Sequence, residues 1–502
     1  MKETLWGRMP SCAPIANRRK VTLFALCAIS AVALPAQTLT TLYRFHDSDG
    51  ANPSAALVQG GSGDLYGTTP NGGTGVYQRG TVFKITPSGK LTTLYNFCAQ
   101  SDCPDGGYPN GLVQGANGDF YGTTSSTVFK IAPSGTLTTL YTFCSLPQCA
   151  DGEDSAAALI QGANGDFYGT TTQDGANPDR QEYAGTVFKI TSSGTLTTLY
   201  SFCTDDGADP CLDGQDPQAA LVQTANGDIY GTASGGGTNL FEGDGGTVFK
   251  ITPGGTLTTL YNFCSQSNCT DGADPNGLVQ GADGNFYGTT HIGGPNGISE
   301  SGYGTVFKIT PGGTLTTLYN FGSQSGDGTY PASGLVQAAD GNFYGTTAKG
   351  GANCTVWGCG TVFSITPSGT LTTLYSFCSQ NKCTDGKTPN AGLVQATNGD
   401  FYGTTSADGD GHGTVFSLSV GLGPFVRTQT TSGKVGAAVT ILGTDLTGST
   451  SVTFNGTPAA FTVVRPSEIA TTVPAGATTG TVQVATPNGT LSSNVPFLVR
   501  QP

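Results

Sequence analysis

Charged residues, methionine, tryptophan and histidine are all scarce in this chain. Only 11% of its 502 residues are charged, and it contains 2 Met, 2 Trp and 3 His. The shortage of charged helix-forming residues excludes coiled coils and helical bundles. The formal net charge is −13, which gives the chain no counter-ion reason to bind a phosphate backbone and argues against nucleic acid as a partner.

Long apolar runs are also lacking, and none is long enough to span a bilayer. The longest, from Val21 to Leu34, follows an Arg-Arg-Lys segment and ends among small residues. This pattern is typical of a signal peptide, which we expect over residues 1–36 with cleavage near Ala33 or Ala36. The mature chain is then expected to lack a transmembrane segment and to be secreted, held at the cell surface or periplasmic.

Glycine, by contrast, is abundant at 77 residues, and it accompanies a repeat. Tyr-Gly-Thr begins at positions 66, 121, 168, 230, 287, 344 and 402. Thr-Val-Phe also occurs seven times, and Leu-Thr-Thr-Leu-Tyr occurs seven times but starts one segment earlier. A repeat of this kind indicates an architecture in which each unit packs against its neighbours.

Each unit contains four short β-like segments, which we name A to D. In one unit they are 112–114, 120–124, 127–131 and 137–143. They are rich in β-branched and aromatic residues, and tight Asn-Gly, Asp-Gly or Pro-Ser-Gly turns separate A from B and C from D. Four antiparallel strands repeated seven times predict an all-β, seven-bladed β-propeller over 37–420, with the repeated Tyr and Phe packed between blades.

The Leu-Thr-Thr-Leu-Tyr motif starts one segment earlier than the other two motifs, and this offset predicts how the ring closes. The chain begins with a D segment at 39–45, and the seventh unit ends after its C segment at 414–419. The N-terminal strand is therefore expected to complete the last blade. An open solenoid is the alternative, but it would need polar capping repeats at both ends.

The string Asp-Leu-Tyr-Gly-Thr-Thr, followed by Gly-Thr-Val-Phe-Lys-Ile and Leu-Thr-Thr-Leu-Tyr, resembles the GloVer tandem repeat of bacterial exported proteins. The resemblance covers residues 38–420. It implies a surface or secreted protein class without an established activity.

A second module follows a linker at 421–424. Short strands alternate with turns over 425–502, and their density predicts an Ig-like β-sandwich without a disulfide. The phrases Val-Thr-Ile-Leu-Gly-Thr-Asp-Leu and Val-Thr-Phe-Asn-Gly-Thr-Pro-Ala resemble an IPT/TIG domain. Such a module implies a spacer or a binding unit.

Twelve of the 14 cysteines lie beyond the signal segment and form six pairs that are close in sequence. An even number with near partners is typical of disulfides in an oxidising compartment. Zinc is the alternative, but structural zinc usually takes Cys-x2-Cys pairs. We therefore predict the disulfides Cys98–Cys103, Cys144–Cys149, Cys203–Cys211, Cys264–Cys269, Cys354–Cys359 and Cys378–Cys383.

The loops of the repeat differ between the two ends of the predicted blades. The A–B and C–D turns are short and uniform, whereas the B–C and D–A loops are long and variable. Binding residues concentrate in variable loops on a rigid scaffold, so the B–C and D–A rim is the candidate functional face. Aromatic residues outside the repeat consensus lie in B–C loops and are candidates for stacking on a glycan, with packing inside the loops as the alternative: Tyr77, Tyr183, Phe241, Tyr303 and Trp357.

Every D–A loop also carries an Asp-Gly pair. Its members are Asp49, Asp105, Asp151, Asp213, Asp271, Asp327 and Asp385. We interpret them as turn residues. The alternative is a ring of carboxylates near the channel mouth that binds Ca²⁺, and no other cofactor is indicated.

Catalytic motifs are lacking as well. No Gly-x-Ser-x-Gly, His-Glu-x-x-His or phosphate loop occurs, and His46, His291 and His412 fall in different repeats. The sequence therefore favours a monomeric binding protein whose variable rim meets a glycan or a protein. A secreted carbohydrate-active enzyme with carboxylates at the channel mouth and a purely structural surface protein are the alternatives.

Overall fold

The computed structural model describes residues 37–176, 184–203, 211–238, 245–297, 302–354 and 358–500. Strands dominate these ranges. Their helical residues form three short 3-10 turns, Pro147–Cys149, Ser267–Cys269 and Asn381–Cys383. Within the same ranges, no helix has the length and apolar character needed to cross a membrane.

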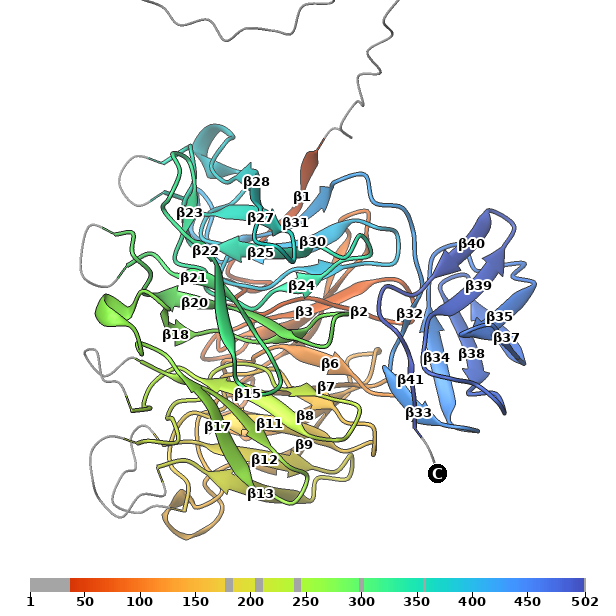
Figure 1. Cartoon of the computed structure of the whole chain (residues 1–502), viewed down its shortest axis with the longest axis horizontal. Coiled ribbons are helices and arrows are strands. Elements are labelled where there is room, and N and C mark those ends of the chain that lie inside the picture. The colour runs from red at the N-terminus through yellow and green to blue at the C-terminus, as the bar shows by residue number, and fades with distance from the viewer. Residues whose placement is uncertain are drawn as a thin grey trace, which may run out of the picture. The chain divides into compact units, whose positions relative to one another are not determined.

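The repeats fold into seven antiparallel sheets, numbered here in chain order, whose strands follow the A-B-C-D order of the repeat (Figure 1). The first four sheets are β2 (Val58–Gln59), β3 (Leu65–Thr69), β4 (Thr81–Ile85) and β5 (Leu91–Asn96); β6 (Leu112–Gln114), β7 (Phe120–Thr123), β8 (Thr127–Ile131) and β9 (Leu137–Thr142); β10 (Ile160–Gln161), β11 (Phe167–Thr171), β12 (Thr186–Ile190) and β13 (Leu196–Ser201); and β14 (Val222–Gln223), β15 (Ile229–Ala233), β16 (Thr247–Ile251) and β17 (Leu257–Asn262).

The remaining sheets follow the same order with small additions. The fifth is β19 (Val279–Gln280), β20 (Phe286–Ile292), β21 (Thr305–Ile309) and β22 (Leu315–Asn320), with β18 (Ala273–Pro275) also paired to β20. The sixth is β24 (Val336–Gln337), β25 (Phe343–Thr347), β27 (Thr361–Ile365) and β28 (Leu371–Ser376), and a separate two-stranded antiparallel sheet pairs β23 (Gly328–Thr329) with β26 (Lys349–Gly350). The seventh is β29 (Val394–Gln395), β30 (Phe401–Thr405), β31 (Thr414–Ser419) and β1 (Thr38–Arg44).

Strand β1 comes from the start of the repeat region yet completes the seventh sheet. It pairs antiparallel with β31, beside which it lies in Figure 1, as the sequence predicts for the N-terminal strand. At the end of β1, the Arg44 guanidinium donates to Asp408 at 2.9 Å and to Asp410 at 2.5 Å. These ion pairs attach the closing strand to the B–C loop of the seventh sheet.

Edge-to-face phenylalanine pairs join each sheet to the next. The Phe after strand D of one sheet meets the Phe of strand C of the following sheet, with ring centroids 5.1–5.3 Å apart. Phe377 and Phe416 join the sixth sheet to the seventh, and Phe45 and Phe83 join the seventh back to the first. The seven contacts therefore form a closed cycle.

Stacked rings make a second layer between the B strands. In five of the interfaces the Tyr of one sheet stacks on the Phe of the next, with centroids 3.9–4.2 Å apart. Ile229 and Leu65 replace the Phe at the other two positions and pack there without a ring. The repeated aromatic residues thus fill the sheet-to-sheet core, as predicted.

The segments leading into the seven A strands surround one cavity of about 370 Å³. Each repeat contributes small residues to its wall, such as Ala55, Gly111 and Ala157. Small side chains are needed where seven segments converge. The A strands are therefore innermost and the D strands outermost, and we call this cavity the channel.

The C-terminal module has two four-stranded sheets. One contains β32 (Arg427–Thr428), β34 (Ala438–Leu442), β38 (Glu468–Thr472) and β37 (Phe461–Arg465), and the other contains β36 (Thr457–Ala459), β35 (Ser451–Phe454), β39 (Val482–Thr486) and β40 (Gly489–Ser492). A short parallel pair joins β33 (Ser432–Lys434) to β41 (Leu498–Arg500). Residues of both sheets, including Ile441 and Val484, form one apolar core.

The module is in contact with the short-turn end of the seven sheets, and residues 37–502 form one compact unit. Ser467 donates to the carbonyl of Gly61 at 2.7 Å, and the Gln429 amide donates to the Gln114 side chain at 2.6 Å. Gly61 follows an A strand and Gln114 ends one. The long B–C and D–A loops are at the other ends of the strands.

The closed cycle predicts that the contact made by the closing strand contributes as much stability as an internal one. Phe45→Ala and Phe202→Ala each remove one fully buried ring, its edge-to-face contact with the next sheet and its edge-to-face contact with the tyrosine of its own D strand. Each should lower the free energy of unfolding in urea by about 3–5 kcal/mol. In an open array the terminal contact frays, so a cost for Phe45→Ala below about 1 kcal/mol beside a full cost for Phe202→Ala would contradict the closed cycle.

Candidate functional site

Each D–A loop holds its Asp through a tyrosine of the preceding D strand. The tyrosine hydroxyl donates to the carboxylate, with oxygen–oxygen distances of 2.6–2.9 Å. The pairs are Tyr43–Asp49, Tyr95–Asp105, Tyr141–Asp151, Tyr200–Asp213, Tyr261–Asp271, Tyr319–Asp327 and Tyr375–Asp385. This repeated contact orders the start of every loop.

Asp151 illustrates how fully these carboxylates are engaged. It is completely buried and also accepts bonds from the backbone N–H groups of Ser145 and Leu146. Burial by itself would raise the pKa of Asp151, but the Tyr141 hydroxyl and the two N–H donors hold that pKa below its ordinary value. Burial, and then the neighbouring carboxylate, raises the pKa of Tyr95 to about 12.

These contacts place the Asp carboxylates beside the outermost strands. The calcium alternative places them near the channel mouth, whereas each carboxylate accepts a hydrogen bond from the tyrosine of a D strand. Hydrogen bonds of this kind, made within the loop and to the strand before it, are what a turn residue makes, and the sequence favours that role for these Asp residues. Binding of calcium by these loops stays a prediction.

A different set of residues stands at the channel mouth, three positions after each of these Asp residues. All seven have a left-handed backbone with φ between 53° and 57°, a conformation that residues other than glycine rarely adopt. Six precede a proline, and the chain then enters the channel wall. We call this set the mouth ring: Asn52, Tyr108, Asp154, Asp216, Asp274, Tyr330 and Thr388.

Hydrogen bonds to neighbouring sheets fix the mouth-ring backbone. The N–H of Tyr330 donates to the carbonyl of Tyr303 in the preceding sheet, and its own carbonyl accepts from Ala348 in the following one, both at 2.9 Å. Across the described residues, six members donate to the preceding B–C loop in the same way, at 2.8–3.3 Å. A strained conformation persists only where its surroundings impose it, and here two sheets do so.

One side of the mouth ring is acidic. Burial, and then repulsion by Glu153 and Asp216, raises the pKa of Asp154. Burial, followed by a hydrogen bond with Glu153, likewise raises the pKa of Asp174, which is 8% exposed. Asp216 accepts from the Gln218 amide at 2.5 Å. Four carboxyl groups from three loops are thus close enough to influence one another's protonation.

The other members include two tyrosines, each beneath a cation. The Arg79 guanidinium carbon lies 4.9 Å from the centroid of the Tyr108 ring, and the Lys349 ammonium lies 4.7 Å from that of Tyr330. The Tyr330 ring also meets Tyr303 at 5.7 Å and His291 at 5.5 Å. Burial lowers the pKa of His291, so its imidazole is neutral and donates from Nδ1 to the carbonyl of residue 331.

The predicted aromatic candidates have different outcomes. Tyr303 is part of the Tyr330 cluster, and Tyr77 is 53% exposed on its own loop. Tyr183, Phe241 and Trp357 lie outside the described residues. Sequence reasoning missed the mouth ring itself. The signal for it was the residue at a constant offset of three from each loop Asp, directly before proline in all but one repeat.

The sequence comparisons identify the repeat. Residues 26–178, 75–269 and 243–460 match the Gloeobacter/Verrucomicrobia repeat. The chain belongs to this repeat family. Residues 424–499 of this repeat protein match the IPT/TIG domain, which confirms the second resemblance. No curated protein matches its sequence.

Solved structures similar to this repeat protein share few of its residues. A streptogramin B lyase is 17% identical over 76% of this chain and 97% of its own, with a TM-score of 0.49. Virginiamycin B lyase from Staphylococcus aureus is 15% identical over 76% and 99%, with a TM-score of 0.49. An extracellular domain of a two-component system from B. thetaiotaomicron is 11% identical over 91% and 57%, also with a TM-score of 0.49.

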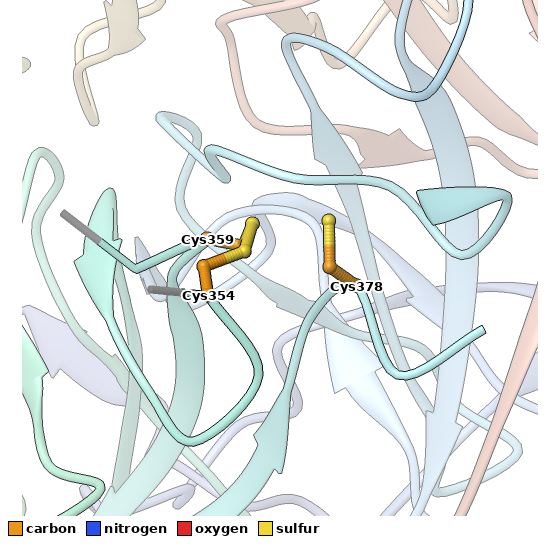
Figure 2. A group of neighbouring side chains, drawn as sticks. All are labelled: Cys354, Cys359 and Cys378. Carbon is orange, nitrogen blue, oxygen red and sulfur yellow. A yellow bond between two sulfur atoms is a disulfide. The ribbon is translucent and has the colours of Figure 1, made fainter. Parts of the chain in front are cut away.

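All six predicted disulfides of the repeat protein are formed. Five close D–A loops, and Cys354–Cys359 closes the B–C loop of the sixth sheet. Figure 2 shows the sulfur of Cys378 beside that bridge, and these three sulfur atoms lie within 4.8 Å of one another. Because the cysteines are paired as disulfides, they lack the free thiolates that zinc takes as ligands.

The tyrosine–aspartate pairs predict a loss of stability in alkali. A tyrosine whose pKa is higher in the folded state stabilises the fold below its unfolded pKa, about 10, and this contribution is lost as the pH rises through the folded pKa. Tyr95, Tyr261 and Tyr375 have a folded pKa of about 12. The free energy of unfolding in urea should therefore fall between about pH 10 and pH 12.

The triple variant Tyr95→Phe, Tyr261→Phe and Tyr375→Phe is the control for this prediction. It retains the rings and lacks the titrating hydroxyls, so its stability should fall less over the same pH range. An identical pH profile for the variant and the parent would show that these pairs do not carry the effect.

Proposed function

We propose that the seven sheets are the blades of a seven-bladed β-propeller and that the C-terminal module is an Ig-like sandwich. The pairing of β1 with β31, the cycle of phenylalanine contacts and the channel with seven contributors support the propeller. The single core between the two four-stranded sheets supports the sandwich.

We also propose that the protein is exported and acts outside the cytoplasm, at the cell surface or in the medium. The apolar segment from Val21 to Leu34, after its basic residues, supports export. Six loop disulfides support an oxidising compartment, because such bonds persist there and are rare in the cytosol.

Its proposed function is to bind an extracellular ligand, a glycan or a protein, at the mouth ring and the loops around it. The observation that carries this proposal is the contrast within the ring: seven positions share one backbone geometry yet present Asn, Tyr, Asp and Thr side chains. A scaffold that keeps its backbone constant while its side chains vary is typical of a recognition surface. Preformed loops also lose less entropy on binding.

A glycan fits the chemistry of the ring best. The faces of Tyr108 and Tyr330 suit the apolar face of a sugar ring, and the carboxylates of Asp154, Asp216 and Asp274 suit its hydroxyl groups as acceptors. Three neighbouring carboxylates repel an anionic chain, so the favoured ligand is an uncharged glycan or one that carries amino groups.

A glycan array probed with residues 37–502, in calcium and again in EDTA, tests this proposal. We expect a selective hit that Tyr330→Asn and Asp216→Asn weaken by at least about tenfold. Asparagine tolerates the left-handed backbone, so both variants should keep the fold. Tyr303→Ala should weaken the same hit, because Tyr303 supports the Tyr330 ring.

Val464→Ala is the matched control, since Val464 is an exposed apolar side chain on the C-terminal module. It should bind as the parent does. An array without hits in either buffer would overturn glycan recognition and leave a protein as the ligand. A hit that EDTA abolishes would support calcium binding by the loops.

A carbohydrate-active enzyme is the second candidate, and the acidic side of the mouth ring favours it. Glycoside hydrolysis needs two carboxyl groups in different protonation states. The raised pKa of Asp154 beside Asp216 meets that requirement in part. If the protein is such an enzyme, Asp154→Asn should abolish release of reducing sugar from the bound glycan while retaining binding. An absence of hydrolysis by the parent protein would exclude this candidate.

A further inference from the structure

A second cavity, of about 280 Å³, lies where the C-terminal module meets the innermost strands. Strands β6, β10 and β14 of the second to fourth sheets form one wall, and residues 429–432 with Leu498 and Arg500 form the other. Its volume is close to the lower end of about 300–1,000 Å³ that small-molecule sites occupy. It is on the short-turn end of the sheets, separate from the mouth ring.

The lining of this cavity offers hydrogen-bond donors and a positive charge. It contains four glutamines, several hydroxyl groups and the Arg500 guanidinium, and none of its residues is Asp or Glu. The Nε of Arg500 is buried without a hydrogen-bond partner among the described residues. A buried donor left unpaired costs about 1–3 kcal/mol, and more when it is charged. The site is therefore electropositive and unsatisfied in a chain whose net charge is −13.

The three glutamines on the wall formed by the sheets also have donors to spare. The amides of Gln114, Gln161 and Gln223 each donate to the carbonyl of a glycine in their own A–B turn. An amide NH₂ has two hydrogens, so one remains on each side chain at the cavity wall. Their oxygens are occupied: Gln161 and Gln223 accept from the turn of the preceding sheet, and Gln114 accepts from Gln429 of the module.

Arg427 does not line this cavity but is two residues before Gln429, which does. Side chains alternate along a strand, so Arg427 shares a face with Gln429, which contacts the seven sheets, whereas Val426 points into the core of the module. Burial lowers the pKa of Arg427, and no carboxylate of the described chain offsets that effect.

We propose that this cavity binds a small polar molecule carrying one carboxylate or phosphate group, with the Arg500 guanidinium as its anchor. A guanidinium presents paired N–H donors that match either oxyanion bidentately. The glutamine amides and threonine hydroxyls then hydrogen-bond the rest of the molecule. Because its two walls belong to the sheets and to the C-terminal module, the bound ligand stabilises their contact.

Calorimetry and thermal unfolding of residues 37–502 test the proposal with three probes: glucuronate, glucose 6-phosphate and glucose. We expect at least one anion to bind with a Kd in about the millimolar range or tighter and to raise the melting temperature. Glucose lacks the anionic group and should do neither. The preferred anion shows whether the natural ligand is a carboxylate or a phosphate.

Two variants and a matched control locate the site. Arg500→Gln should weaken anion binding by at least about tenfold. Arg500→Lys keeps the positive charge but lacks the paired N–H donors of the guanidinium, so it should give an intermediate affinity. Arg465→Gln removes an equal charge from the same module. Arg465 is already paired with Glu468 at 2.7 Å and does not line this cavity, so this variant should bind as the parent does.

Either of two results would overturn the proposal. One is that neither anion binds the parent protein at about 10 mM. The other is that Arg500→Gln binds as tightly as the parent. The mouth-ring variant Tyr330→Asn should leave anion binding unchanged, so failure of glycan recognition and failure of the anion site are distinguishable.

Discussion

Edge-to-face packing of one phenylalanine after strand D on another in the next strand C is the contact on which the rest of the structure depends. It occurs at all seven interfaces and closes through Phe45 and Phe83, where the first strand of the repeat region has joined the last sheet. The sheet-to-sheet core therefore consists of buried rings, and Arg44 reinforces the closing strand with two ion pairs. The largest buried apolar contacts thus lie between strands, and the variable parts of the loops lie outside this core.

Two contacts that recur in the repeats order the D–A loops. A tyrosine of strand D holds the loop aspartate, and three residues later neighbouring sheets hold the mouth-ring residue in a left-handed conformation. Two repeated restraints thus bring a variable side chain to an equivalent place in every repeat. The result is an acidic side around Asp154 and Asp216 and aromatic positions at Tyr108 and Tyr330, all on the same backbone frame.

The two ends of the seven sheets have different chemistry. The long-loop end carries the mouth ring and the five D–A loops that disulfides close, whereas the short-turn end meets the C-terminal module. Gln114 shows what this contact changes: its side-chain oxygen accepts from Gln429 of the module, while the corresponding Gln161 accepts from a neighbouring turn. The cavity at the same junction is lined by Arg500 and by no carboxylate, so the negative net charge is unevenly distributed.

Strand positions, disulfide pairs and the closing strand could be predicted from the sequence, because each depends on a pattern visible in the chain. Turn residues at fixed offsets mark the strands, and cysteines a few residues apart mark the disulfides. The D segment that precedes the first A segment marks the closing strand. The sites depended on the tertiary structure. The path of each D–A loop decided that Asp151 reaches back to Tyr141 rather than into the channel, and that Asp154 stands beside Asp216 from another repeat. The cavity at Arg500 likewise needs residues from five segments that are far apart in the sequence. Such groups meet only in the folded protein, after the sheets have packed and the module is in place. The repeat pattern of the sequence does not indicate which of them come together.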